Sequence, residues 1–336
     1  MRLKCLFLLR AEARLLPTSL EAKMRHYRMI YEILWSQSPR ISVKDISSAL
    51  HIDPRTTSRR MKEAFDQGYI AGPQIRKRSY ANMKEYMYFI SCENPFPKYV
   101  SYSQDERVVY HARMAGFASL WIISRTPLDI KDAIVLEGYR SDYHLSYAPT
   151  HSWERAVKIM KASIETCYLN RYKPKEILKN RHNTYVQWDE EDEALHQYFK
   201  YNLRKPFSPV MRRHLITSGK IYAFLEKLPS CCTITTSYFP EGIASYDPYL
   251  FMFNTEYEDF IIDLFSQLPT SSFFFKVSDR LFLLAYVKRH LLRYDGLTMS
   301  GIGQLQIPIL VKALLDKKII NSEDHAIVEY HWAKDL

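Results

Sequence analysis

Glycine and cysteine are scarce in this chain of 336 residues. Its nine glycines form no G-x-x-x-x-G-K, G-x-G-x-x-G or G-x-S-x-G pattern, so neither a phosphate-cradling loop nor a hydrolase nucleophile turn is expected. Its five cysteines contain no C-x-x-C pair, and their odd number fits reduced thiols better than a disulfide framework. We therefore expect neither a disulfide nor a zinc finger.

Long apolar runs are also missing. No segment reaches the roughly 18 consecutive apolar residues of a membrane helix. The apolar part of the basic N-terminal stretch is about five residues long, shorter than the roughly 7–15 that a secretory signal needs. We expect a soluble, cytoplasmic protein that does not contact a membrane. Its N-terminal stretch is expected to be a loose arm or an extra helix.

Acidic residues are fewer than basic ones: 37 Asp and Glu stand against 47 Lys and Arg, which gives a formal net charge of +10. Residues 24–84 alone hold twelve Lys and Arg against five Asp and Glu, and so contribute seven of these ten charges. A concentrated cationic surface attracts phosphate whatever the base sequence. Nucleic acid is therefore the first partner to consider.

The same segment has the pattern of a helix-turn-helix. Apolar residues at helical spacing predict a first helix over 24–37, which Ser38 and Pro39 end. Ser42 can cap a second helix, and Asp53 followed by Pro54 predicts the start of a third. In this third helix Thr57, Met61, Ala64 and Phe65 would face inward.

The outward face of the third helix is the predicted reading surface for double-stranded DNA. It holds Arg55, Thr56, Ser58, Arg59 and Lys62. After Gly68, residues 71–80 are predicted to form a wing, a turn in which Arg76, Lys77 and Arg78 contact phosphates. Sequence preference would come from Arg59 or Arg55 on a guanine edge, whereas Arg60 either contacts a phosphate from the side or anchors the helix to an acidic group.

After residue 84 the pattern changes to that of a second domain. Residues 86–90 predict a buried strand, 97–104 a short helix, and 108–114 with 117–124 a hairpin that turns at Ala115-Gly116. Segments 134–139 and 143–147 predict strands and 153–164 a helix. The order predicts an α+β sandwich of ferredoxin-like type.

The second half repeats this plan. Residues 249–253 echo 86–90 about 163 positions later, and 273–277 with 281–287 echo the hairpin. Three predicted helices precede them at 189–203, 208–215 and 218–228, but residues 189–245 hold seven cations and seven anions, which argues against a second DNA reader. The predicted domains are an arm (1–23), a winged helix-turn-helix (24–84), a ferredoxin-like sensor and oligomerisation domain with linker (85–183), a degenerate winged-helix module (184–245) and a second ferredoxin-like domain (246–336).

Three segments together resemble the Lrp/AsnC family of transcription regulators. They are residues 46–50 in the second helix, 57–61 in the third, and Gly68-Tyr69-Ile70-Ala71-Gly72 at its exit. The resemblance implies a winged helix-turn-helix, a ferredoxin-like domain through which the chain oligomerises, and a small-molecule effector. Ala118 stands where that family has an acid near its glycine turn, so a free amino acid is not implied as effector.

We therefore predict a sequence-specific transcription regulator, not an enzyme, that acts as a homodimer or higher homo-oligomer without cofactor or metal. One alternative is an enzyme resembling the siroheme decarboxylases, with His111, Arg113 or His144 on the carboxylates of a tetrapyrrole. The DNA-reading cations argue against it, since such an enzyme has no need of them. Another alternative is a protein-binding co-regulator that uses its neutral second half.

Overall fold

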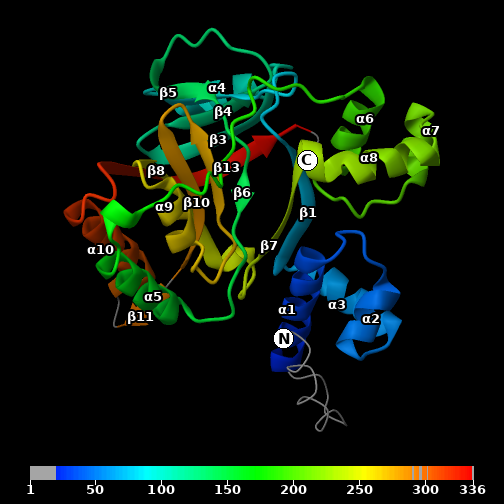
Figure 1. Cartoon of the computed structure of the whole chain (residues 1–336), viewed down its shortest axis with the longest axis horizontal. Helices are drawn as coiled ribbons and strands as arrows, with labels where there is room; N and C mark the ends of the chain where they lie inside the picture. The colour runs from blue at the N-terminus through cyan, green and yellow to red at the C-terminus, as the bar shows by residue number, and fades with distance from the viewer. Residues whose placement is uncertain (1–19, 290, 295–296, 301, 335–336) are drawn as a thin grey trace.

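The structure is a computed structural model that describes residues 20–289, 291–294, 297–300 and 302–334. It places a large antiparallel sheet beside two groups of helices, with a two-stranded ribbon between them (Figure 1). Most of the predicted arm, residues 1–19, lies outside the described residues. Within the described part no helix has the length and apolar character needed to cross a membrane.

The N-terminal group of helices confirms the predicted helix-turn-helix. It consists of α1 (Leu20–Ser36), α2 (Val43–Leu50) and α3 (Pro54–Asp66). Apolar residues of all three helices share one core, in which Ile30, Ile46 and Met61 are buried. Helices α2 and α3 have only 8 and 13 residues, and each buries one apolar stripe, so their stability comes mainly from this shared burial rather than from helix propensity.

The turn predicted within residues 71–80 is wrong. Residues 70–77 do not turn back on themselves but form one strand, β1 (Ile70–Lys77), which pairs antiparallel with β7 (Cys232–Tyr238). The register runs from Ile70 opposite Tyr238 to Lys77 opposite Cys232. The backbone groups of β1 thus find their hydrogen-bond partners in the second half of the chain, which removes the need for a local hairpin.

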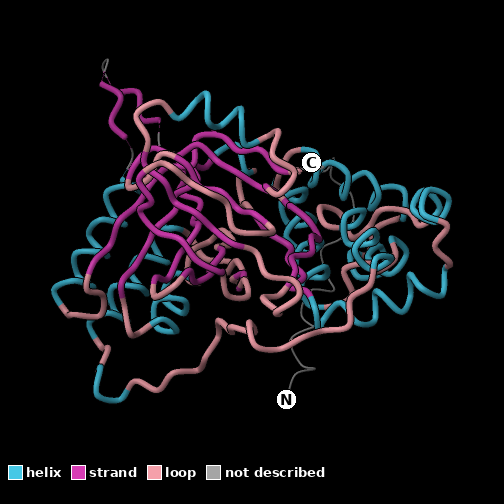
Figure 2. The backbone as a smooth tube through the Cα atoms, turned by 90° about the horizontal axis from the view of Figure 1, so that it is seen from above, coloured by secondary structure: helices cyan, strands magenta, loops and turns pink. Residues whose placement is uncertain are grey.

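The second group of helices comprises α6 (Glu190–Phe199), α7 (Ser208–His214) and α8 (Ser218–Cys231), which leads directly into β7. Its core includes Phe199, Phe224 and Ile221 together with Ile75 of β1. Strand β1 therefore leaves the first group of helices and completes the core of the second. The two groups lie next to each other on one side of the sheet (Figure 2).

Among the described residues, nine strands form the main sheet in the order β5-β2-β4-β3-β13-β8-β10-β9-β6. Their bounds are β2 (Tyr86–Ser91), β3 (Val108–Gly116), β4 (Leu120–Ser124), β5 (Ala133–Tyr139), β6 (His144–Leu145), β8 (Tyr246–Asn254), β9 (Phe273–Val277), β10 (Arg280–Lys288) and β13 (Ser322–Ala333). The antiparallel pairing of β3 with β13 joins strands of the first half to strands of the second. A small separate sheet contains β11 (Leu291–Tyr294) and β12 (Leu297–Ser300).

The sheet curls so that side chains of both halves meet inside it. Phe89 of β2 stacks on Phe282 of β10 with ring centroids 4.6 Å apart, and Trp121 of β4 stacks on Phe275 of β9 at 5.6 Å. A bridge between Arg140 and Val277 brings the end of β5 next to β9. These four aromatic side chains belong to the buried core inside the sheet.

Four helices flank the sheet: α4 (Pro95–Tyr102), α5 (Trp153–Glu165), α9 (Glu258–Phe265) and α10 (Ile302–Asp316). Although α5 follows the strands of the first half, it packs in one core with α9, α10 and strands of the second half. Strand β6 likewise pairs with β9. Short 3-10 turns stand at Leu169–Arg171 and Ile243–Ser245. The two halves therefore exchange elements rather than packing as separate bodies.

The predicted hairpin exists, but its turn is displaced. Strand β3 continues through Ala115 and Gly116, and β4 begins only at Leu120. Gly116 lies opposite Ala326 of β13, and a Cβ atom added to it would come within 2.2 Å of the His325 carbonyl oxygen. The glycine therefore permits a close approach of two strands instead of making the turn. The α+β class, with a helix-turn-helix followed by an antiparallel sheet, is confirmed.

Candidate nucleic-acid interface

Local chemistry explains why α2 and α3 begin where they do. The Ser42 hydroxyl accepts a hydrogen bond from the Asp45 amide at 3.1 Å, and the Asp53 carboxylate accepts one from the Thr56 amide at 2.8 Å. Both are N-caps that satisfy amides left without helical partners. Between the helices His51 adopts a left-handed conformation with φ 54°. This short turn fixes the direction of α3 relative to α2.

Two faces of α3 differ sharply. Thr57, Arg60, Met61 and Ala64 are buried against the other helices. Phe65, which the sequence also places inside, is only half-buried. The spacing of these residues leaves one continuous outer face that starts at the N-cap. In known helix-turn-helix proteins this end of the recognition helix contacts base edges.

Four of the predicted DNA-reading residues on α3 are exposed: Arg55, Ser58, Arg59 and Lys62. Thr56 is half-buried beside the cap. The side chain of Arg59 is 63% exposed and that of Lys62 is 76% exposed. Their acidic neighbours are one turn away on the same helix, Glu63 at 3.9 Å from Arg59 and Asp66 at 2.5 Å from Lys62. Such exposed pairs are weak, so both cations are available to phosphate.

Arg60 lies inside rather than on the reading face. Its side chain is 1% exposed, and its Nη1 donates a hydrogen bond to Glu63 at 2.7 Å. The same carboxylate accepts from the Tyr27 hydroxyl of α1 at 2.9 Å. Burial and this carboxylate together raise the pKa of Tyr27 to about 12. Of the two roles predicted for Arg60, the structure favours the anchor to an acidic group.

The three cations of the predicted wing are engaged within the protein. Arg76 donates to Gln74, Lys77 to Glu193 of α6, and Arg78 to Asp142. Burial alone would raise the pKa of Glu193, but Lys77 and neighbouring hydrogen bonds lower it to about 2. Contact of these three side chains with phosphate stays a prediction, and it would require these interactions to open.

The corresponding helix of the second group, α8, has its cations neutralised. Lys220 pairs with Asp189 at 2.5 Å and with Asp192 at 3.1 Å, both at the start of α6. Lys227 also pairs with Asp192, which is buried. The surface of α8 instead exposes Tyr222 and Glu226. This face offers no cationic stripe like that of α3.

Two arginines connect the helical groups in a reciprocal way that the sequence did not reveal. Arg40, between α1 and α2, donates to the carbonyls of Leu203 and Lys205, the latter at 3.0 Å. Arg204, between α6 and α7, donates to the carbonyls of Pro39 and Ile41 at 2.8 Å. Burial lowers the pKa of both guanidinium groups. Since the partners are about 160 positions apart, a single sequence carries no signal of this contact.

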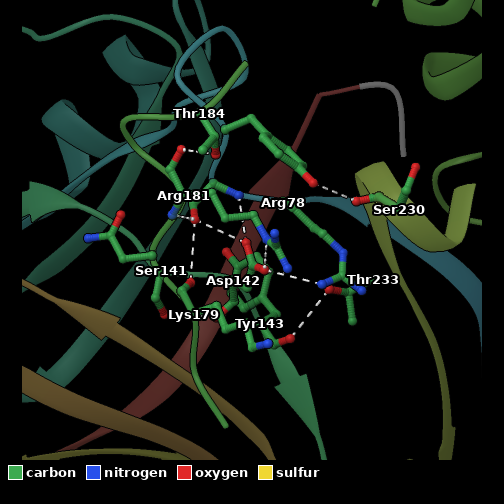
Figure 3. Close-up of polar contacts among 12 residues, drawn as sticks. Arg78, Ser141, Asp142, Tyr143, Lys179, Arg181, Thr184, Ser230 and Thr233 are labelled. Carbon is green, nitrogen blue, oxygen red and sulfur yellow. Dashed lines mark hydrogen bonds and ion pairs between the residues drawn. The ribbon is translucent and has the colours of Figure 1, made fainter. Parts of the chain in front are cut away.

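A cavity of about 290 Å³ lies where four parts of the chain meet. They are α1, the ribbon of β1 and β7, strand β6, and the linker of residues 172–189 before α6. Asp142 lies beside the cavity and is only 4% exposed (Figure 3). Its carboxylate interacts with four donor groups. Its Oδ1 accepts from the Ser79 amide at 2.7 Å and the Ser79 hydroxyl at 3.0 Å, while its Oδ2 pairs with Arg78 at 3.3 Å and Arg181 at 2.9 Å. This carboxylate therefore fastens the end of β1 and the linker to the sheet.

The residues of the enzyme alternative do not gather in one place. His111 is fully buried and stacks on Trp332, and burial lowers its pKa to about 4. Arg113 donates to the Met114 and Ser119 carbonyls of its own hairpin. His144 lies on β6, five strands from β3 in the sheet order, and lines the cavity. No group of three or more His, Cys, Asp or Glu that could hold a metal is found among the described residues.

Comparison with known proteins adds a sequence match to this geometry. Residues 28–71 match a family described as winged helix-turn-helix DNA-binding, a range that runs from α1 into β1. Among curated proteins no sequence matches the chain. The chain is similar to two solved structures, the siroheme decarboxylase NirDL (12% identity, 92% of each chain, TM-score 0.48) and the same protein in co-complex with an iron-uroporphyrin III analogue (13%, 92% of each chain, 0.46). At these identities the likeness assigns no activity, and the chain is identified only as carrying a winged helix-turn-helix of the DNA-binding type.

Proposed function

We propose that this protein is a sequence-specific transcription regulator that inserts α3 into the major groove of duplex DNA. The observation that carries the proposal is the outer face of α3, where Arg55, Arg59 and Lys62 are exposed on a capped helix inside the matched segment. A helix of this kind fits the major groove, and arginine can pair with both acceptors of guanine. Phosphate contacts by the remaining cations fix the register.

The chain carries two copies of one plan, of which the first reads DNA. Three helices and a ribbon strand occur twice, as α1-α2-α3-β1 and α6-α7-α8-β7, and each set is followed by a strand, a helix and two strands. The antiparallel β1-β7 and β3-β13 pairings join the copies. Only the first copy exposes a cationic recognition helix, so a palindromic operator needs two chains.

Two other functions have less support. The candidate contacts to the carboxylates of a tetrapyrrole are His111, Arg113 or His144, and these side chains lie in separate surroundings. A co-regulator that only binds protein leaves the exposed cations of α3 without a role. We therefore favour a regulator that binds DNA as two copies of the chain over an enzyme or a protein-binding co-regulator.

The salt dependence of binding tests this proposal. For duplex DNA, the logarithm of the association constant falls with the logarithm of salt concentration by about 0.9 per neutralised phosphate. Three α3 cations and a few further contacts predict a slope of about −3 or steeper. Fluorescence anisotropy of a labelled duplex over a range of salt concentrations measures it. A slope near zero, or no binding even at low salt, would contradict the proposal.

A further inference from the structure

The cavity between the helical groups and the sheet has walls from four parts of the chain. Trp35 comes from the end of α1, Ile234 from β7, His144 from β6 and Lys179 from the linker before α6. Its volume of about 290 Å³ stands at the lower limit for sites that hold small organic molecules. The cavity thus borders both the sheet and the helices α1, α2 and α3, which are called the reading module below.

Cations outnumber acids in its lining. Arg78, Lys179 and Arg181 contribute three positive charges, and Asp142 contributes one negative charge. This buried carboxylate is already shared between the two guanidinium groups. Arg78 directs further donors to the carbonyls of Pro229 and Cys232, which satisfy hydrogen bonds but carry no charge. The lining therefore keeps an excess of positive charge that favours an anion.

The remaining walls are largely apolar. Trp35 and Tyr143 offer aromatic surface, and Leu145, Ile177 and Ile234 offer aliphatic surface. Burial lowers the pKa of His144, which disfavours a positive charge on that imidazole. A bare inorganic anion would leave these walls without a partner, whereas a carboxylate attached to an apolar body would contact both kinds of wall.

We propose that this cavity is a binding site for a small organic carboxylate with an aromatic or branched aliphatic body. The carboxylate lies near Lys179 and Arg181, and the apolar body lies against Trp35 and Ile234. Because Trp35 belongs to α1 and His144 to the sheet, a bound carboxylate stabilises one orientation of the reading module relative to the sheet. That effect on DNA rests on the proposed function, but the binding itself does not.

Calorimetric titration of the full chain with phenylacetate tests the site. This probe has ten non-hydrogen atoms, which at typical ligand efficiencies corresponds to a dissociation constant on the order of 1 mM. Phenylacetamide has the same shape without the charge and should bind at least about tenfold more weakly. Failure of phenylacetate to bind at concentrations well above this range, or equal binding of the amide, overturns the proposal.

A pair of linker variants locates the binding. Lys179→Ala removes an exposed cation of the cavity and should weaken phenylacetate binding about three- to tenfold. Lys173→Ala removes an exposed cation of the same linker outside the cavity and should leave binding unchanged. Equal effects of the two variants overturn the site. Arg181 is unsuitable for this test because it also holds Asp142.

DNA binding measured with and without phenylacetate separates the two proposals. A chain that binds DNA but not phenylacetate overturns the cavity proposal alone. A chain that binds phenylacetate but no duplex overturns the proposed function and leaves the cavity site in place. Where both bind, a shift in DNA affinity with phenylacetate that disappears in Lys179→Ala supports the coupling, and the absence of any shift overturns it.

Discussion

Replacing Arg55, Arg59 and Lys62 together by alanine should lower the affinity for duplex DNA by roughly a hundredfold or more at moderate salt. At about 1 kcal/mol per lost contact, three contacts correspond to a factor of roughly a hundred. All three side chains are exposed, and the ion pair of Lys62 with Asp66 is a surface pair, so the fold should be retained. Anisotropy titrations and circular dichroism of the variant measure both effects.

The matched control removes three exposed cations from another helix. Arg155, Lys158 and Lys161 lie exposed on α5, which packs with α9 and α10 away from the helical groups (Figure 1). Their triple alanine variant has the same net charge as the α3 variant. It should lose only the few-fold affinity that follows from a smaller overall charge. Equal losses in both variants would show that α3 has no special role.

The substitution Asp142→Asn should lower the stability of the fold strongly. This substitution keeps the size of the side chain but leaves Arg78 and Arg181 without their shared carboxylate. Removing one partner of a fully buried pair costs about 3–5 kcal/mol. Because the two guanidinium groups are 25% and 27% exposed, we expect about 2–3 kcal/mol. Thermal denaturation should show a melting temperature several degrees lower.

Asp263→Asn provides the comparison for this loss. Asp263 also pairs with a linker cation, Lys175, but the two side chains are 54% and 61% exposed. Exposed pairs of this kind contribute less than about 1 kcal/mol, so the melting temperature should hardly change. If the two variants melted at the same temperature, Asp142 would not be the fastening point that its four hydrogen-bonded partners suggest.

Local signals made the reading module predictable. Ser42 and Asp53 cap their helices with side chains that reach amides three positions ahead, and such contacts depend only on neighbouring residues. The spacing of Thr57, Met61 and Ala64 likewise fixed which face of α3 is buried. The predicted first helix, 24–37, was also close to the observed α1, Leu20–Ser36. The exposed reading face followed from these neighbours alone.

Long-range pairing set the limit of prediction. The segment 71–80 has glycine, proline and three cations in a row, a composition typical of an exposed turn, yet β1 pairs with a strand about 160 positions away. Glycine is typical of turns, but Gly116 lies within β3, where β13 of the second half approaches its backbone closely. The reciprocal hydrogen bonds of Arg40 and Arg204 to backbone carbonyls of the other helical group also depend on how the two halves pack together.

The ribbon of β1 and β7 connects the reading module to the rest of the chain. Lys77 and Arg78, expected on DNA, instead join β1 to α6 and to Asp142. The former wing residues thus hold the helices α1, α2 and α3 in place, and the exposed cations of α3 remain the proposed contacts to DNA. The cavity at this junction has walls from both parts, and the proposed carboxylate would bind there.

The base preference of Arg59→Ala tests the central claim most directly. Binding of the wild-type chain and the variant to a library of randomised duplexes, sequenced after selection, reports the preference at each base pair. If Arg59 pairs with a guanine edge, the variant should lose about 1–3 kcal/mol of discrimination at one position and keep it at the others. An unchanged preference, or an equal loss of affinity on every sequence, would contradict base reading by this side chain of α3.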